Sequence, residues 1–229
     1  MRFSVVVAAL ALLVFAGPSV AQQKPAPAAP KSAAAAPAAP ALTPAKIDGF
    51  RSAKFGMSEE EVRGAIMHDF SMSDSEVKHD TNPVQMTSAL SVDVKDLLPG
   101  TGLARLSYLF GYRSSKLFSV VIVWARALSP ADTQEILVEA AAVLRAHFET
   151  ESFPKGALVD SGLPDGSVLV FRGVDGQGRM VALTATGLYN ANTGAAGQKE
   201  VAQPDPVLRL TYIADPQHPD VYTIKQGEF

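Results

Sequence analysis

The chain of 229 residues carries 20 Lys and Arg against 23 Asp and Glu, a formal net charge of -3. The two signs are mixed along the sequence, which argues against a nucleic-acid-binding protein and against a polybasic surface for anionic membranes. The chain contains no cysteine, which excludes a disulfide scaffold and leaves stability to the apolar core.

The N-terminus has the pattern of a secretory signal peptide. Arg2 gives a positive start, residues 5–16 form an apolar run, a Gly-Pro pair ends it, and Ala21 closes a stretch of small residues. The run of about 12 residues is shorter than the ~20 that a membrane-spanning helix needs. We therefore expect residues 1–21 to be removed before Gln22, leaving a protein of the bacterial periplasm or the medium. Lipid anchoring is not expected, because the lipoprotein cysteine is missing.

Residues 22–45 differ in composition from the rest of the chain, being mostly Ala and Pro. Frequent proline prevents a helix, and too few large apolar groups are present to offset the entropy of ordering. We expect a disordered, extended spacer, either without a task or extending the reach of the domain across the envelope. The folded domain is predicted at 46–229, as one unit or as two lobes at 46–126 and 127–229.

A helix is predicted at 59–70. Ser58 and Glu61 have the spacing of a capping box, and Met57 and Val62 that of a hydrophobic staple. A second helix is predicted to open at Ser129 as its cap and to extend to about residue 148.

Strands are predicted where apolar and polar residues alternate. They lie at 86–95, 103–112, 117–125, 167–174, 179–186 and 207–214, with a short candidate at 221–224. The order of elements is helix, three strands, helix, three strands. This order predicts an α+β fold of two layers, with an antiparallel sheet covered on one face by two helices. The two halves form a candidate tandem pseudo-repeat in pattern only.

No catalytic, cofactor-binding or metal-binding residue can be assigned. The histidines show no metal-ligand spacing, and His147 is interpreted as a half-buried packing residue: His68, His79, His147 and His218. Ser161-Gly162 and Gly166-Ser167 are expected in turns, because neither has the pattern of a nucleophile elbow. Residues 173–178 are glycine-rich but lie between two strand patterns, which favours a hairpin over a phosphate loop.

Three further features have both a structural and a functional interpretation. Asp93 and Asp96 are interpreted as solubility features on an edge strand rather than as an acid/base pair. Aromatic residues alternate along two strands and form either the core or a binding face: Tyr108, Phe110, Tyr112, Phe118 and Trp124. The tail 214–229 either docks on the domain or presents a partner site.

The segment FRSAKFGMSEEEVRGAI at 50–66 resembles the helix opening of small bacterial envelope proteins. The barrel-assembly lipoproteins of the outer membrane and the tandem-lobed beta-lactamase inhibitor protein are similar in this respect. The resemblance implies a helix packed on an antiparallel sheet and favours protein partners, and it implies no site residue.

The leading hypothesis is an exported, soluble, non-enzymatic module that binds an envelope protein or another envelope macromolecule through its sheet or loops. Under this hypothesis we expect no bound cofactor and no nucleic-acid partner, and the oligomeric state is left open. One alternative is a small periplasmic hydrolase acting on an envelope polymer, with Asp, Glu, Ser or His brought together by the fold. Another is a purely structural domain needed for envelope integrity.

Overall fold

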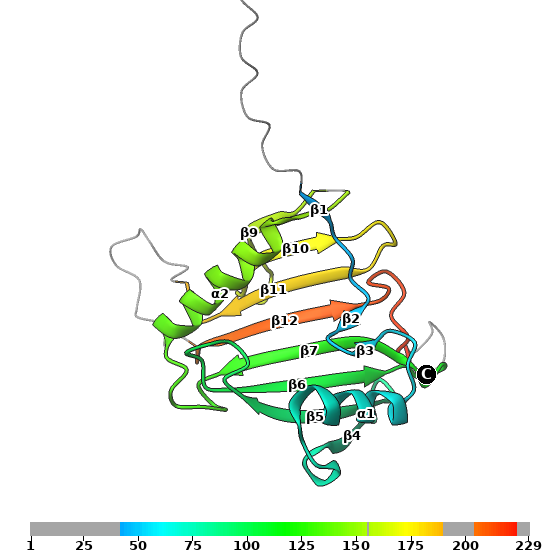
Figure 1. Ribbon diagram of the computed structural model, residues 1–229. Coiled ribbons are helices and arrows are strands. Elements are labelled where there is room, and N and C mark those ends of the chain that lie inside the picture. Colours follow the sequence, from blue (N-terminus) through cyan, green and yellow to red (C-terminus); the bar gives the residue numbers. More distant parts are fainter. Residues whose placement is uncertain (1–41, 155, 190–203, 224–229) are drawn as a thin grey trace, which may run out of the picture. The chain divides into compact units, whose positions relative to one another are not determined.

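The computed structural model describes residues 42–154, 156–189 and 204–223 (Figure 1). The predicted signal peptide, most of the Ala/Pro-rich segment and the last residues of the tail lie outside them. The described residues belong to one compact unit, Pro40–Phe229. They form an α+β fold with a large antiparallel sheet and two α-helices, as predicted. Neither helix is long and apolar enough to cross a membrane.

Eight strands form the main sheet in the order β4-β5-β6-β7-β12-β11-β10-β9. Their bounds are β4 (Lys78–Asn82), β5 (Thr87–Lys95), β6 (Leu103–Phe110), β7 (Leu117–Ala125), β9 (Leu158–Gly162), β10 (Val168–Val174), β11 (Met180–Thr186) and β12 (Val207–Ile213). Consecutive strands are neighbours within each half, and β7 pairs with β12 to join the halves. The two candidate lobes therefore share one continuous sheet.

The first helix, α1 (Glu59–Phe70), confirms the prediction at both ends. The Ser58 side chain accepts a hydrogen bond from the Glu61 amide, and the Glu61 carboxylate accepts one from the Ser58 amide at 2.7 Å. Val62 and Ile66 are the buried residues of its apolar stripe. A 3-10 turn, η1 (Asp74–Glu76), follows the helix.

The second helix, α2 (Gln134–Glu149), starts later than predicted, so Ser129 as its cap is wrong. Thr133 caps the helix instead, accepting a hydrogen bond from the Ile136 amide. Ser129 and Asp132 belong to a preceding turn, in which the Asp132 amide bonds the Ser129 carbonyl. The buried Asp132 carboxylate accepts a hydrogen bond from the Gly102 amide at 2.6 Å, a contact across the fold that holds this turn outside the helix.

The core consists of rows of side chains that cross the sheet from strand to strand. One row, all buried, runs through Val92, Leu106, Ile122, Leu210, Leu183 and Phe171. Helix α1 packs on β5, and α2 packs on β10, β11 and β12. The core cluster joins these rows to the buried residues of both helices.

Residues 45–57, which we call the strap, lie over the central strands between the two helices (Figure 1). The strap contains β2 (Gly49–Phe50) and β3 (Ala53–Lys54), and β2 packs on β7 and β12. Just before it, β1 (Thr43–Pro44) pairs in parallel with β8 (Glu151–Ser152). Gly49 is required in the strap, because its φ is +141° and a Cβ there would lie 2.0 Å from the Ala53 carbonyl oxygen.

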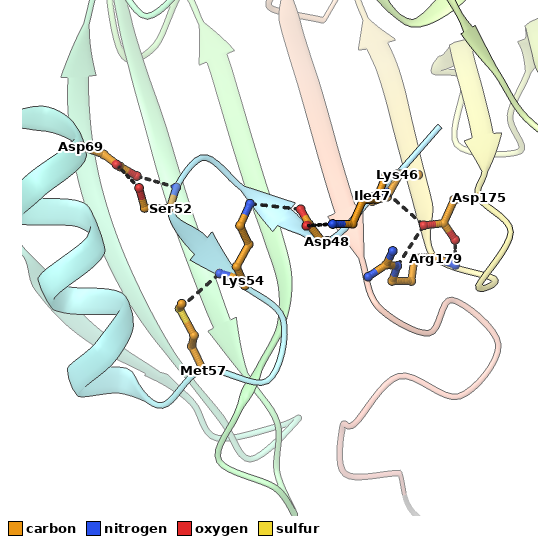
Figure 2. A network of polar contacts seen from close by, with 9 residues as sticks. All are labelled: Lys46, Ile47, Asp48, Ser52, Lys54, Met57, Asp69, Asp175 and Arg179. Carbon is orange, nitrogen blue, oxygen red and sulfur yellow. Dashed lines mark hydrogen bonds and ion pairs between the residues drawn. The ribbon is translucent and has the colours of Figure 1, made fainter. Parts of the chain in front are cut away.

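Polar contacts fix the strap at both ends (Figure 2). The Ile47 amide donates to the Asp175 carboxylate at 3.0 Å, at the turn between β10 and β11. At the other end, the Ser52 amide and hydroxyl donate to the Asp69 carboxylate at 2.9 and 2.6 Å, at the end of α1. The strap thus links the turn between β10 and β11 to the end of α1.

Three details of the strand prediction are wrong. β4 and β9 were not predicted, and each adds an outer strand to its half; all of their residues are exposed, so they lack alternation. β5 is therefore an interior strand and not an edge, because β4 pairs along it. Residues 221–223 form no strand.

Candidate functional site

The fold brings one serine, one glutamate and one histidine together beside α1. The Ser88 hydroxyl donates to the Glu59 carboxylate, and His79 Nε2 lies 3.3 Å from the other Glu59 oxygen. Nucleophilic catalysis needs the imidazole to take the proton of the hydroxyl. Here the carboxylate stands between the two groups, and the contacts connect α1 to β4 and β5. The cluster is therefore a structural tie rather than a catalytic triad.

The other histidines lie apart from one another. His68 lies 3.3 Å from Asp69 and His218 lies 3.4 Å from Asp215. His147 is exposed, with its ring 5.3 Å from that of Phe148, so its interpretation as a half-buried residue is wrong. Within residues 42–154, 156–189 and 204–223, no three His, Asp or Glu side chains gather as a metal site.

The glycine-rich segment 173–178 contains the predicted hairpin turn. The Asp175 amide bonds the Arg179 carbonyl, and the Gly178 amide bonds the Asp175 carbonyl. Ser167 also lies at a turn, as expected, whereas Ser161 lies on β9.

The aromatic stripe divides between core and surface. Tyr108, Phe110 and Trp124 are buried in the core. Tyr112 is 38% exposed and packs edge-on against Tyr222 of the tail at 5.4 Å. The tail residues up to 223 therefore dock on the domain, and Asp220 strengthens this docking by accepting hydrogen bonds from backbone amides of the loop after β6.

Side chains that alternate with the core rows point to the opposite side of the sheet. Several are aliphatic, are partly exposed and do not belong to the core cluster: Leu109, Val121, Val123, Met180 and Ile213. We call this surface the second face. The sequence of β7 indicates this surface, because Val121 and Val123 are apolar although they alternate with the core residues of the same strand.

Arginine side chains flank the aliphatic centre of the second face. Val123 of β7 lies opposite Arg105 on one side and opposite Arg209 on the other, and both arginines are exposed. Arg172 lies on the same face, in the row of Val121. Asp93 binds Arg105 across the strands at 2.7 and 2.9 Å. This hydrogen bonding, opposed by burial, lowers the pKa of Asp93, so the pair stays ionised.

Comparison with known proteins adds no relative: no protein-family model, no curated protein and no solved structure matches this chain. The second face is a candidate binding surface. It combines half-exposed aliphatic residues with cationic groups on a rigid sheet.

Proposed function

We propose that this protein is an exported module of the bacterial envelope that binds another protein through the second face of its sheet. The observation that carries the proposal is the aliphatic centre formed by Val121, Val123 and Ile213, which lies outside the core cluster. Contiguous apolar surface rimmed by polar residues is typical of interaction sites.

The layer arrangement supports this assignment. We infer that α1, the strap and α2 together form a second layer on one face of the sheet and leave the opposite face for a partner. We also interpret the two halves as a tandem repeat. In support, the strands of each half follow the chain from an outer edge of the sheet to its centre, from β4 to β7 in the first half and from β9 to β12 in the second.

The chemistry of the second face favours a partner with acidic and aliphatic side chains. Arg209 lies beside Val123 and Arg172 is on the same face, whereas Arg105, on the other side of Val123, is already paired with Asp93. Arginine is enriched in protein interfaces because its planar guanidinium group binds carboxylates through paired hydrogen bonds. Complementary charge across an interface raises the association rate and selects the partner.

Affinity capture with matched variants tests the binding proposal. The mature chain is immobilised and exposed to an envelope extract of its own bacterium. We expect a stoichiometric protein partner that Val123→Asp and Arg209→Glu release. Val143→Asp, the same change at an exposed position of α2, should retain it. If the wild type and all three variants retain a partner equally, the partner binds outside the second face. If no stoichiometric partner is captured, the proposed function is refuted.

Export is proposed on the sequence of residues 1–21, and it has a separate test. Fractionation of the producing cells, with N-terminal sequencing, should find the protein in the periplasm or the medium, beginning at Gln22. Cytoplasmic protein that still begins at Met1 would refute this part of the proposal.

A further inference from the structure

A cavity of about 220 Å³ lies on the core side of the sheet, opposite the second face. Four separate segments enclose it: the strap, the loop after β5, the central strands and the last turns of α2. Trp124 and Leu210 line it from the central strands, Arg51 from the strap, Leu98 from the loop, and His147 from α2. Figure 1 shows the strap beside α2 above β7 and β12.

The polar groups of this cavity are predominantly hydrogen-bond donors. The Trp124 indole nitrogen is buried and has no hydrogen-bond partner among the described residues. Arg51 bonds a backbone carbonyl, that of Asp69, at 3.2 Å, and its guanidinium lies 4.6 Å from the centre of the Phe70 ring. No carboxylate lines the cavity, and the remaining lining is mainly aliphatic and aromatic. A buried donor without an acceptor is unfavourable, so this lining favours a ligand that supplies oxygen atoms.

A second cavity of about 220 Å³ lies next to the first, along α2. Leu98 lines both cavities, and Ile136 and Val143 line the second. Val143 is 61% exposed, which is high for an aliphatic side chain. Glu139 lines this second cavity, so its charge disfavours an anion there. Arg51 and His147 thus line one cavity and Glu139 lines the other, with Leu98 shared between them.

We propose that the two cavities together form a binding site for a medium-chain fatty acid, with the carboxylate near Arg51 and His147 and the acyl chain extending past Leu98. The size fits such a ligand, since a cavity of roughly 150 Å³ already holds benzene. The site goes beyond the proposed function, because it takes a small molecule on the opposite side of the sheet from the second face.

The single tryptophan of the chain makes binding directly measurable, because Trp124 lines the cavity. The mature protein is titrated with decanoate below its micelle concentration while tryptophan fluorescence is followed. Decanol and decylamine serve as neutral and cationic ligands of the same chain length. We expect saturable binding of decanoate, binding of decanol at least about tenfold weaker, and none of decylamine. From hexanoate to decanoate, each added methylene should tighten binding by up to about fourfold.

Variants separate the contributions of charge and chain. Arg51→Gln should bring decanoate close to decanol in affinity, while Arg113→Gln, on the exposed loop after β6, should leave the preference intact. Leu98→Glu places a carboxylate between the cavities on a partly exposed loop and should weaken all the fatty acids. Circular dichroism checks that each variant is folded.

Equilibrium dialysis with labelled decanoate repeats the titration without relying on fluorescence. The proposal is overturned if wild-type protein binds no decanoate in dialysis, if decanol binds as tightly as decanoate, or if Arg51→Gln keeps the full preference. Because the partner test depends on Val123 and Arg209, failure of either proposal leaves the other measurable.

Discussion

Replacing Asp175 with asparagine should destabilise the fold by about 3 kcal/mol, because this carboxylate anchors the strap. Its side chain is 1% exposed and accepts hydrogen bonds at both oxygens. One oxygen binds the amides of Gln177 and Arg179, which asparagine can still do. The other binds the Ile47 amide and Arg179 Nε at 3.0 and 2.9 Å, and in asparagine a nitrogen donor can take its place.

The magnitude follows from these two lost bonds. An unsatisfied buried amide costs about 1–3 kcal/mol, and a hydrogen bond to a charged group is worth about 1.5–3 kcal/mol. Arg179 is 16% exposed and recovers part of its loss from water, which brings the expected total to about 3 kcal/mol. Asp48→Asn is the matched control. Asp48 forms ion pairs with Lys46 and Lys54 at the surface, and its loss should cost about 0–1 kcal/mol.

The effect of Asp175→Asn should also depend on pH. Burial opposes ionisation of Asp175, but the hydrogen bonds from Ile47, Gln177 and Arg179 prevail and lower its pKa in the folded state. A lowered folded pKa stabilises the fold above the unfolded value of about 3.9, and this contribution is lost as pH falls through the folded value. The difference between wild type and variant should thus be constant from about pH 7 to 5 and shrink below about pH 4.

Urea unfolding at several pH values measures the difference in free energy, and hydrogen exchange at the Ile47 amide reports the local bond. The variant should accelerate this exchange even where the fold remains intact. A cost no larger than that of Asp48→Asn, together with unchanged exchange at Ile47, would refute the anchoring role of Asp175.

Three further substitutions test separate parts of the fold by the same unfolding assay. Ser58→Ala removes the cap of α1 and should cost about 1 kcal/mol; no change would contradict the capping box. Burial raises the pKa of Asp132, and its second carboxylate oxygen is buried without a partner among the described residues. Asp132→Asn removes the buried charge and keeps the hydrogen bond from Gly102, so it should stabilise the fold by about 1 kcal/mol at pH 7. Marked destabilisation would contradict this reasoning. Gly173→Ala places a Cβ 2.4 Å from the buried Phe153 ring and should cost about 2 kcal/mol; a neutral effect would show that the ring moves freely.

The elements that the sequence predicted correctly are specified by neighbouring residues. The capping box of α1 needs only Ser58 and Glu61, three positions apart. Strands β6, β7, β10, β11 and β12 each bury one face, so their alternation is visible in the sequence.

The elements that were missed depend on contacts between distant residues. All residues of β4 and β9 are exposed, and the strands join the sheet through backbone pairing, so no alternation of buried and exposed residues marks them in the sequence. The start of α2 was misplaced because Ser129 and Thr133 are both good caps. The choice between them involves Asp132 and Gly102, which are 30 residues apart.

The two proposed sites differ in how far the sequence could indicate them. The second face leaves a signal in β7, where Val121 and Val123 extend the apolar pattern to both sides of the strand. The cavity leaves none, because Arg51, Leu98, Trp124 and His147 come from four segments and are combined only by the fold. A site of this kind therefore has no motif within a single stretch of the chain.

Strand β7 connects the two proposals, since consecutive side chains of a strand point to opposite faces. Ile122 and Trp124 are buried on the core side, while Val121 and Val123 are half-exposed on the second face. A partner and a fatty acid would therefore contact the same backbone from opposite sides without sharing a side chain. Because Val123 does not line the cavity, a change confined to Val123 leaves the cavity lining in place, and the two binding activities can be separated one residue apart.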